Sequence, residues 1–192
     1  MSVNLLKGQK ISLNKENHNL KNVDVTLGWR LGNIKTGDGM FDVDVSAFLL
    51  TAAGKVESPK DFVFYGNLRH PSGAVLLMNS QRNLNDYIVK VKLDLSLIPP
   101  NVMRIAFTAT IYEAEARKQS FAGVNDIFIK IGSGQSNIEI LNYNVAEKFT
   151  TESAVIFGEI YRNNNEWKFN AMGNGCQGGL AALCGNYGVE VG

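Results

Sequence analysis

The sequence predicts an all-β fold, a two-sheet β-sandwich of about ten strands with one or two short helices. Three observations support this prediction. Apolar and polar residues alternate over several segments, turn-forming residues separate these segments at intervals of ~8–12 residues, and only two short stretches are rich in helix-forming residues.

The alternation is clearest at 23–29, where Val23, Val25, Leu27 and Trp29 are separated by Asp24, Thr26 and Gly28. Successive side chains of a strand point to opposite faces, so such a segment turns one face to a core and the other to water or a second layer. Segments 87–95, 103–111 and 127–131 repeat the pattern, and shorter strands are expected at 61–65, 74–78, 138–143, 154–161 and 167–171.

Two segments depart from the strand pattern. Residues 113–119 (EAEARKQ) are good helix formers and predict one or two helical turns. Residues 179–184 predict a short C-terminal helix that ends at Gly185.

Composition narrows the possible functions. The chain has 192 residues, 45% of them hydrophobic and 19% charged, which is typical of a packed globular protein, and we expect a single domain over 1–192. The net charge of +1 gives no reason to expect nucleic-acid binding or attraction to an anionic membrane. The sequence has neither a secretory signal pattern nor an apolar run of ~20 residues, so we expect a cytoplasmic protein without direct membrane insertion.

No arrangement of residues indicates catalysis. Cys176 and Cys184 match no zinc or redox spacing and are expected to be reduced thiols. A hydrolase would need an acid–base pair that converges in space, for which His70 with Glu113 or Asp86 are the candidates. We expect the protein not to be an enzyme.

The segment 37–46 (GDGMFDVDVS) contains the most suggestive side chains. Asp42 and Asp44 are two residues apart on an expected strand, so their carboxylates share a face, while Phe41, Val43 and Val45 face a core. Adjacent like charges are readily explained by a bound cation such as calcium, to which Asp38 can add an oxygen. The alternative is that both carboxylates are simply solvated.

Several segments together resemble the TerD family of tellurium-resistance and stress-response proteins. They are LGW at 27–29, FDVDVSAFLL at 41–50, DFVFY at 61–65, TIYEAEARKQSF at 110–121, FGEIYR at 157–162, EWKF at 166–169 and GGLAAL at 178–183. The resemblance implies a β-sandwich that binds calcium at acidic loops on one end. It also implies a non-enzymatic role in resistance to tellurite and other stresses, including phage, through partner proteins in a membrane-associated assembly.

This chain departs from the family pattern at the acidic positions. Arg30 stands where an acid usually follows the Gly-Trp pair, and Met40 replaces another common acid. The long acidic loop is shortened to 79–86, which keeps only Asp86, and Glu113 stands where Asp is common. The metal ligands that the resemblance leaves are Asp42, Asp44, Asp86, Asp38 and Glu113. We therefore expect weak calcium binding, or none, with pairing of Arg30 to Asp42 or Asp44 as an alternative.

Two other hypotheses remain open. The first is a small-ligand binder that uses loops at one end of the sandwich, which an apolar pocket rimmed by Tyr65, Tyr112 or His70 would favour. The second is self-association through exposed strand edges and the segment 157–161.

Overall fold

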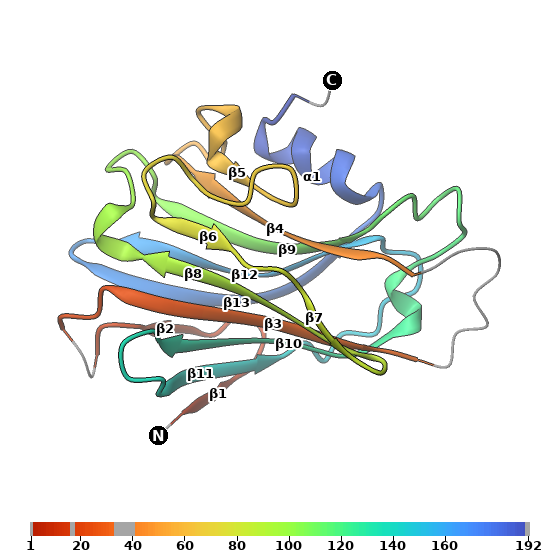
Figure 1. Cartoon of the computed structure of the whole chain (residues 1–192), viewed down its shortest axis with the longest axis horizontal. Helices are drawn as coiled ribbons and strands as arrows, with labels where there is room; N and C mark the ends of the chain where they lie inside the picture. The colour runs from red at the N-terminus through yellow and green to blue at the C-terminus, as the bar shows by residue number, and fades with distance from the viewer. Residues whose placement is uncertain (1, 16–17, 33–40, 191–192) are drawn as a thin grey trace.

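The computed structural model describes residues 2–15, 18–32 and 41–190, and these form two stacked β-sheets with one α-helix (Figure 1). The seven-stranded sheet has the order β1-β11-β10-β3-β8-β6, with β7 paired to the side of β8. Its strands are β1 (Val3–Leu5), β11 (Glu139–Asn144), β10 (Val124–Ser133), β3 (Asn22–Leu31), β8 (Asp86–Asp94), β6 (Val75–Leu77) and β7 (Gln81–Asn83).

The six-stranded sheet has the order β2-β13-β12-β9-β4-β5. Its strands are β2 (Lys10–Ser12), β13 (Glu166–Cys176), β12 (Ala154–Asn163), β9 (Arg104–Ile111), β4 (Val43–Leu50) and β5 (Phe62–Val63). Strand pairs in both sheets are antiparallel, except that β1 runs parallel to β11. These findings confirm the predicted all-β sandwich.

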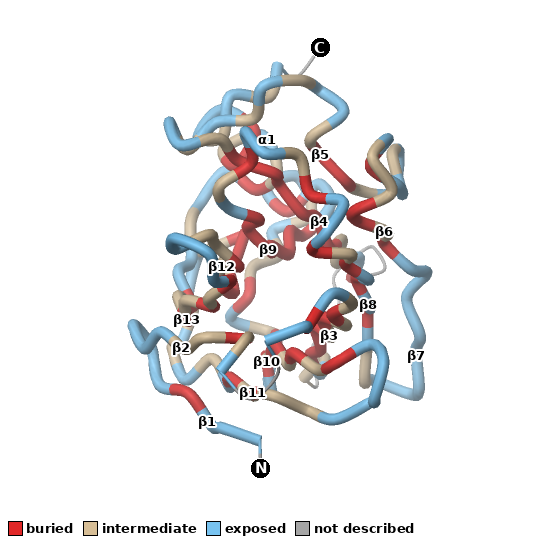
Figure 2. The backbone as a smooth tube through the Cα atoms, turned by 90° about the vertical axis from the view of Figure 1, so that its left-hand side faces the viewer, coloured by how far each residue is buried: buried red, intermediate tan, exposed pale blue. Residues whose placement is uncertain are grey.

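The main hydrophobic core lies between the sheets, and Figure 2 shows buried stretches along the long strands of both layers. The alternation predicted for β3 is confirmed, because Val23, Val25 and Leu27 are fully buried and Trp29 is 3% exposed. From the opposite sheet, β4 contributes Val45, Ala47 and Leu49 to the same core.

A second, smaller core covers part of the outer face of the six-stranded sheet. There α1 (Gly179–Tyr187) packs Leu183 and Cys184 against Phe48 and other outward-facing side chains. The ring centroids of Phe48 and Tyr187 are 4.7 Å apart. In Figure 1, α1 and β5 lie beyond β4 and β9, and the chain termini lie on opposite sides of the stack.

Helix formation at 113–119 was predicted wrongly, because residues 112–118 form a series of turns. The amide of Arg117 donates to the Glu113 carbonyl at 3.0 Å, but Glu113 and Lys118 both have left-handed φ angles, 49° and 52°. A left-handed residue at each end prevents the hydrogen-bond ladder from continuing.

The predicted C-terminal helix is present but longer than expected. It continues past Gly185 to Tyr187 and ends at Gly188, which has a φ of 77° and supplies the left-handed cap. The remaining helical elements are single 3₁₀ turns, η1 (Pro59–Asp61), η2 (Leu95–Leu97) and η3 (Phe121–Gly123). No helix in the described ranges is long and apolar enough to cross a membrane.

Candidate functional site

The predicted acidic pair lies where the chain enters β4. Asp42 is exposed and directly precedes the strand, and Asp44 lies opposite Thr110 of β9. Phe41 and Val45 are buried and Val43 packs against the core, as predicted. Burial raises the pKa of Asp44, and the negative charge of Asp42 raises it further. Asp44 is therefore a partly desolvated carboxylate beside a second negative charge.

Asp44 lines a groove of about 970 Å³ on the outer face of the six-stranded sheet. One wall is formed by the turns after β9, including Tyr112 and Glu113, and another by the first residues of α1. The aromatic residues of the groove are Tyr65 and Tyr112, which are 60% and 45% exposed. The groove thus combines carboxylates with accessible aromatic rings.

Glu113 lies in the same groove as Asp44, but other side chains already engage its carboxylate. Its Oε2 atom lies 3.2 Å from a guanidinium nitrogen of Arg117, and Glu113 also forms a hydrogen bond with Tyr112. That hydrogen bond, together with the charge of Glu113, raises the pKa of Tyr112. A cation at Glu113 would have to compete with Arg117.

Asp86 lies on the seven-stranded sheet, opposite Arg30 in the register of β3 and β8. Arg30 Nε donates to the Asp86 carboxylate at 2.6 Å, and Arg30 Nη1 lies 3.1 Å from Asp126 Oδ2. The hydrogen bond to Asp86 and the two negative charges raise the pKa of Arg30. The predicted pairing of Arg30 with Asp42 or Asp44 is wrong, because its partners are Asp86 and Asp126.

These placements bear on the predicted calcium ligands. Asp38 lies outside the described residues. Within the described residues, no group of three or more acidic, histidine or cysteine side chains is arranged to hold a metal ion. Asp42 and Asp44 fit a cation, because a positive ion would neutralise two neighbouring negative charges, one of them on a partly desolvated carboxylate. Asp86 and Glu113 fit less well, because arginines already neutralise them.

His70 pairs with neither Glu113 nor Asp86, the candidate partners for a hydrolase. His70 is 5% exposed, and its ring nitrogens lie 2.8 Å from Ser72 Oγ and 3.0 Å from Asp61 Oδ1. These contacts hold His70 in the turn before β6 and exclude the pairing with Glu113 or Asp86 that a catalytic role required.

The two cysteines are free thiols, Cys184 buried on the face of α1 that packs on the sheet and Cys176 half-buried at the end of β13. Burial raises the pKa of both thiols. The thiolate is the reactive form, so neither cysteine is primed for nucleophilic chemistry.

Sequence reasoning missed Asp126 as a partner of Arg30. It lies where the register between β10 and β3 shifts, with a left-handed φ of 49°. Aspartate tolerates this conformation better than most residues, but neither neighbour of Asp126, Asn125 or Ile127, is a glycine or proline that would indicate the irregularity.

A family model for the TerD domain matches residues 1–187. The chain belongs to the TerD family. It is 45% identical to general stress protein 16U of Bacillus subtilis and 43% identical to tellurium resistance protein TerD of Serratia marcescens. Each comparison spans 196 aligned residues and the full length of both proteins.

A solved structure supports the fold of this TerD-family chain. A homologue of telluride resistance protein (TerD) from Streptomyces coelicolor superposes with a TM-score of 0.64 at 19% identity. The superposition covers 85% of this chain and 95% of that one. At this identity the likeness extends to the sandwich fold alone.

Proposed function

We propose that this TerD-family protein is a non-enzymatic, cytoplasmic stress-response module that acts through protein partners and has weak or no calcium binding. Full-length relatives named for general stress and for tellurium resistance support the broad role. Its partners would be other stress-response or tellurium-resistance proteins, including membrane-associated ones. The non-enzymatic assignment draws support from the enclosed position of His70 and from the raised pKa of both thiols.

The proposal of weak or absent calcium binding rests on the ion pairs that Arg30 forms with Asp86 and Asp126. Calcium affinity depends on the number of negatively charged ligands and on the rigidity of the site. A guanidinium between two carboxylates supplies positive charge where a cation would otherwise bind, and it opposes a divalent ion nearby. We therefore place any calcium affinity near ~10⁻⁴–10⁻³ M.

Asp42 and Asp44 are the carboxylates best suited to any calcium binding that this chain retains. Glu113 would complete the set only by leaving Arg117, 3.2 Å away. When bound, the ion would neutralise the two carboxylates at the start of β4, next to the groove that contains Tyr65 and Tyr112. Residual calcium binding would thus alter the charge of this groove.

Calcium titration by calorimetry, with thermal unfolding in calcium and in chelator, tests the proposed weak site. We expect no heat of binding at micromolar calcium and no change in Tm there. A Tm increase of several degrees at micromolar calcium would overturn the claim. Asp44→Asn is the matched variant, since any residual binding at millimolar calcium should disappear in it.

The partner-binding role has a separate test. A tagged copy, cross-linked in cells during tellurite stress, should recover a reproducible set of proteins. An unrelated tagged β-sandwich of similar size provides the control. If both baits recover the same proteins, the partner proposal fails.

A small-ligand binder is the second candidate, because the groove carries the aromatic rim that this hypothesis required. Tyr65 and Tyr112 line it together with Asp44 and Glu113. Accessible aromatic rings beside carboxylates suit a flat, cationic ligand. NMR titration with small aromatic cations should shift signals of the groove and spare the opposite sheet. Tyr112→Ala should abolish these shifts, and shifts spread over the whole surface would argue against a site.

A further inference from the structure

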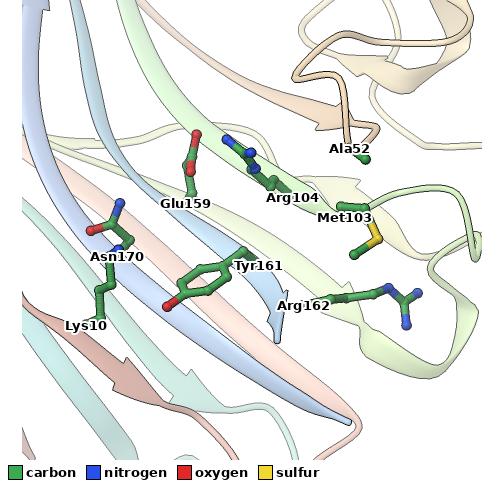
Figure 3. A pocket seen from close by; sticks show the side chains of 8 residues that line it. All are labelled: Lys10, Ala52, Met103, Arg104, Glu159, Tyr161, Arg162 and Asn170. Atoms are coloured by element: carbon green, nitrogen blue, oxygen red, sulfur yellow. The ribbon is translucent and has the colours of Figure 1, made fainter. Parts of the chain in front are cut away.

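A second hollow, of about 400 Å³, lies on the outer face of the six-stranded sheet and is not used by the proposed function. Figure 3 shows its lining side chains, which come from β2, β9, β12 and β13 and, for Ala52 and Met103, from the loops after β4 and before β9. The residues are Lys10, Ala52, Met103, Arg104, Glu159, Tyr161, Arg162 and Asn170. The two hollows share no lining residue.

Strand register brings the polar residues of this hollow into two neighbouring rows. Lys10 lies opposite Asn170, and Asn170 lies opposite Glu159, so three adjacent strands form the first row. Arg104 lies opposite Tyr161 in the second row. The intervening Ile105, Ile160 and Phe169 are fully buried in the core, which turns the polar residues outward.

The three cations of the hollow have different roles. Arg162 is a structural residue, because it donates to the carbonyl oxygens of Val102 and Ile98 and lies over the Trp167 ring at 4.4 Å. Lys10 and Arg104 are exposed, and neither forms an ion pair within 4.0 Å to a side chain in the described parts of the chain. These two positive charges are available to a ligand.

Glu159 is the unusual member of the set. It is half-buried, and no described residue donates a hydrogen bond to its carboxylate. Burial raises its pKa, while the charges of Arg104 and Lys10 act in the opposite direction. A partly desolvated carboxylate without a protein donor loses some of its hydration, and a ligand that donates a hydrogen would compensate for that loss.

We propose that this hollow binds a small oxyanion that carries an acidic hydroxyl group, of which hydrogenphosphate is the simplest. Arg104 and Lys10 bind the negatively charged oxygens, and Glu159 accepts the hydroxyl hydrogen. The Asn170 amide and the Tyr161 hydroxyl supply further hydrogen-bonding groups beside the ion. The carboxylate makes the site selective, because it repels an anion that has no hydrogen to donate.

Comparing three anions that all carry two negative charges at pH 8 distinguishes the effect of charge on affinity from the effect of a donated hydrogen. Hydrogenphosphate retains a hydroxyl, whereas sulfate has none and methyl phosphate, with a second pKa of about 6, has lost its own. NMR titrations of the full chain at constant ionic strength measure each affinity. We expect hydrogenphosphate to bind about tenfold more tightly than the other two, as one charge-assisted hydrogen bond implies.

Single variants assign the roles. Arg104→Ala should weaken hydrogenphosphate about tenfold or more through the lost charge-assisted contact. Glu159→Gln should remove the preference for hydrogenphosphate over sulfate and methyl phosphate. Lys92→Ala is the control, since Lys92 is an exposed cation on β8 of the opposite sheet, and it should bind like the parent.

Thermal unfolding of each variant shows whether it is folded, which is expected because Arg104 and Lys92 are exposed and glutamine keeps the size of the half-buried Glu159 side chain. Equal affinity of the parent for all three dianions overturns the proposal, as does equal loss in Arg104→Ala and Lys92→Ala. Binding of no anion at millimolar concentration also overturns it. None of these outcomes bears on calcium binding or on partner proteins.

Discussion

Arg30 Nε donates to the carboxylate of Asp86 at 2.6 Å, although the two residues are 56 positions apart in the sequence. They face each other in the register of β3 and β8, and the same guanidinium reaches Asp126 at 3.1 Å. The resemblance to the TerD family implies that most members have an acid at the position that Arg30 occupies here. The arginine found there neutralises two carboxylates of this chain.

Asp44→Asn should raise stability at neutral pH. The pKa of Asp44 is raised in the folded protein, so the folded state binds its proton more readily than the unfolded state does. The ionised side chain therefore costs stability above its folded pKa, and protonation at lower pH removes this cost. We expect a gain below about 1 kcal/mol at pH 7, since the group is partly solvated, and none below the ordinary pKa of aspartate.

Urea denaturation between pH 3 and 8 in chelator measures this gain for Asp44→Asn. Glu115→Gln is the control, because Glu115 is an exposed carboxylate of the neighbouring turns. A variant that is less stable than the parent at pH 7 would mean that the ionised carboxylate stabilises the fold.

Leu183→Ala should destabilise the protein by about 2–5 kcal/mol, the usual cost of a cavity at a buried leucine. Leu183 is fully buried in the second core between α1 and the six-stranded sheet. Asn186→Ala, an exposed position on the same helix, should change stability by less than about 0.5 kcal/mol. Urea denaturation compares the two, and similar small losses would contradict the docking of α1 on the sheet.

Gly158→Ala and Gly185→Ala should have opposite effects. A Cβ atom at Gly158 would lie 2.4 Å from the backbone oxygen of Asn170, so the paired strands would have to shift at a cost of about 1–3 kcal/mol. A Cβ atom at Gly185 meets nothing within 4 Å, and alanine favours a helix over glycine by about 0.5–1 kcal/mol. Thermal unfolding should show a lower Tm for the first variant, and a higher Tm there would contradict the close approach.

Strands that bury one face were predictable from the sequence, whereas short edge strands were not. Val23 to Trp29 alternate with polar residues, and this pattern alone identifies β3. β7 consists of Gln81, Arg82 and Asn83, all exposed, so it has no apolar signal and forms only by pairing with β8. β1 and β2, of three residues each, are also too short to show a period.

Of the candidate site, the sequence could predict only the residues that are close together in the chain. Asp42 and Asp44 are neighbours in sequence, so their shared face follows from strand geometry. The partners of Arg30 depend on the pairing of three strands and on an irregularity at Asp126, which no local pattern indicates. Glu113 misled the helix prediction, because its left-handed φ overrides the helix propensity of its neighbours.

Calcium titration of Arg30→Ala beside the parent tests the central claim most directly. Removing the guanidinium frees Asp86 and Asp126, and the stability cost should stay below about 1 kcal/mol because Arg30 is 55% exposed. Arg82→Ala, which removes an exposed arginine from β7, is the matched control. We predict that Arg30→Ala binds calcium several-fold more tightly than the parent and Arg82→Ala. Equal or weaker binding in Arg30→Ala would contradict the claim that this arginine occupies carboxylates, Asp86 and Asp126, that would otherwise bind calcium.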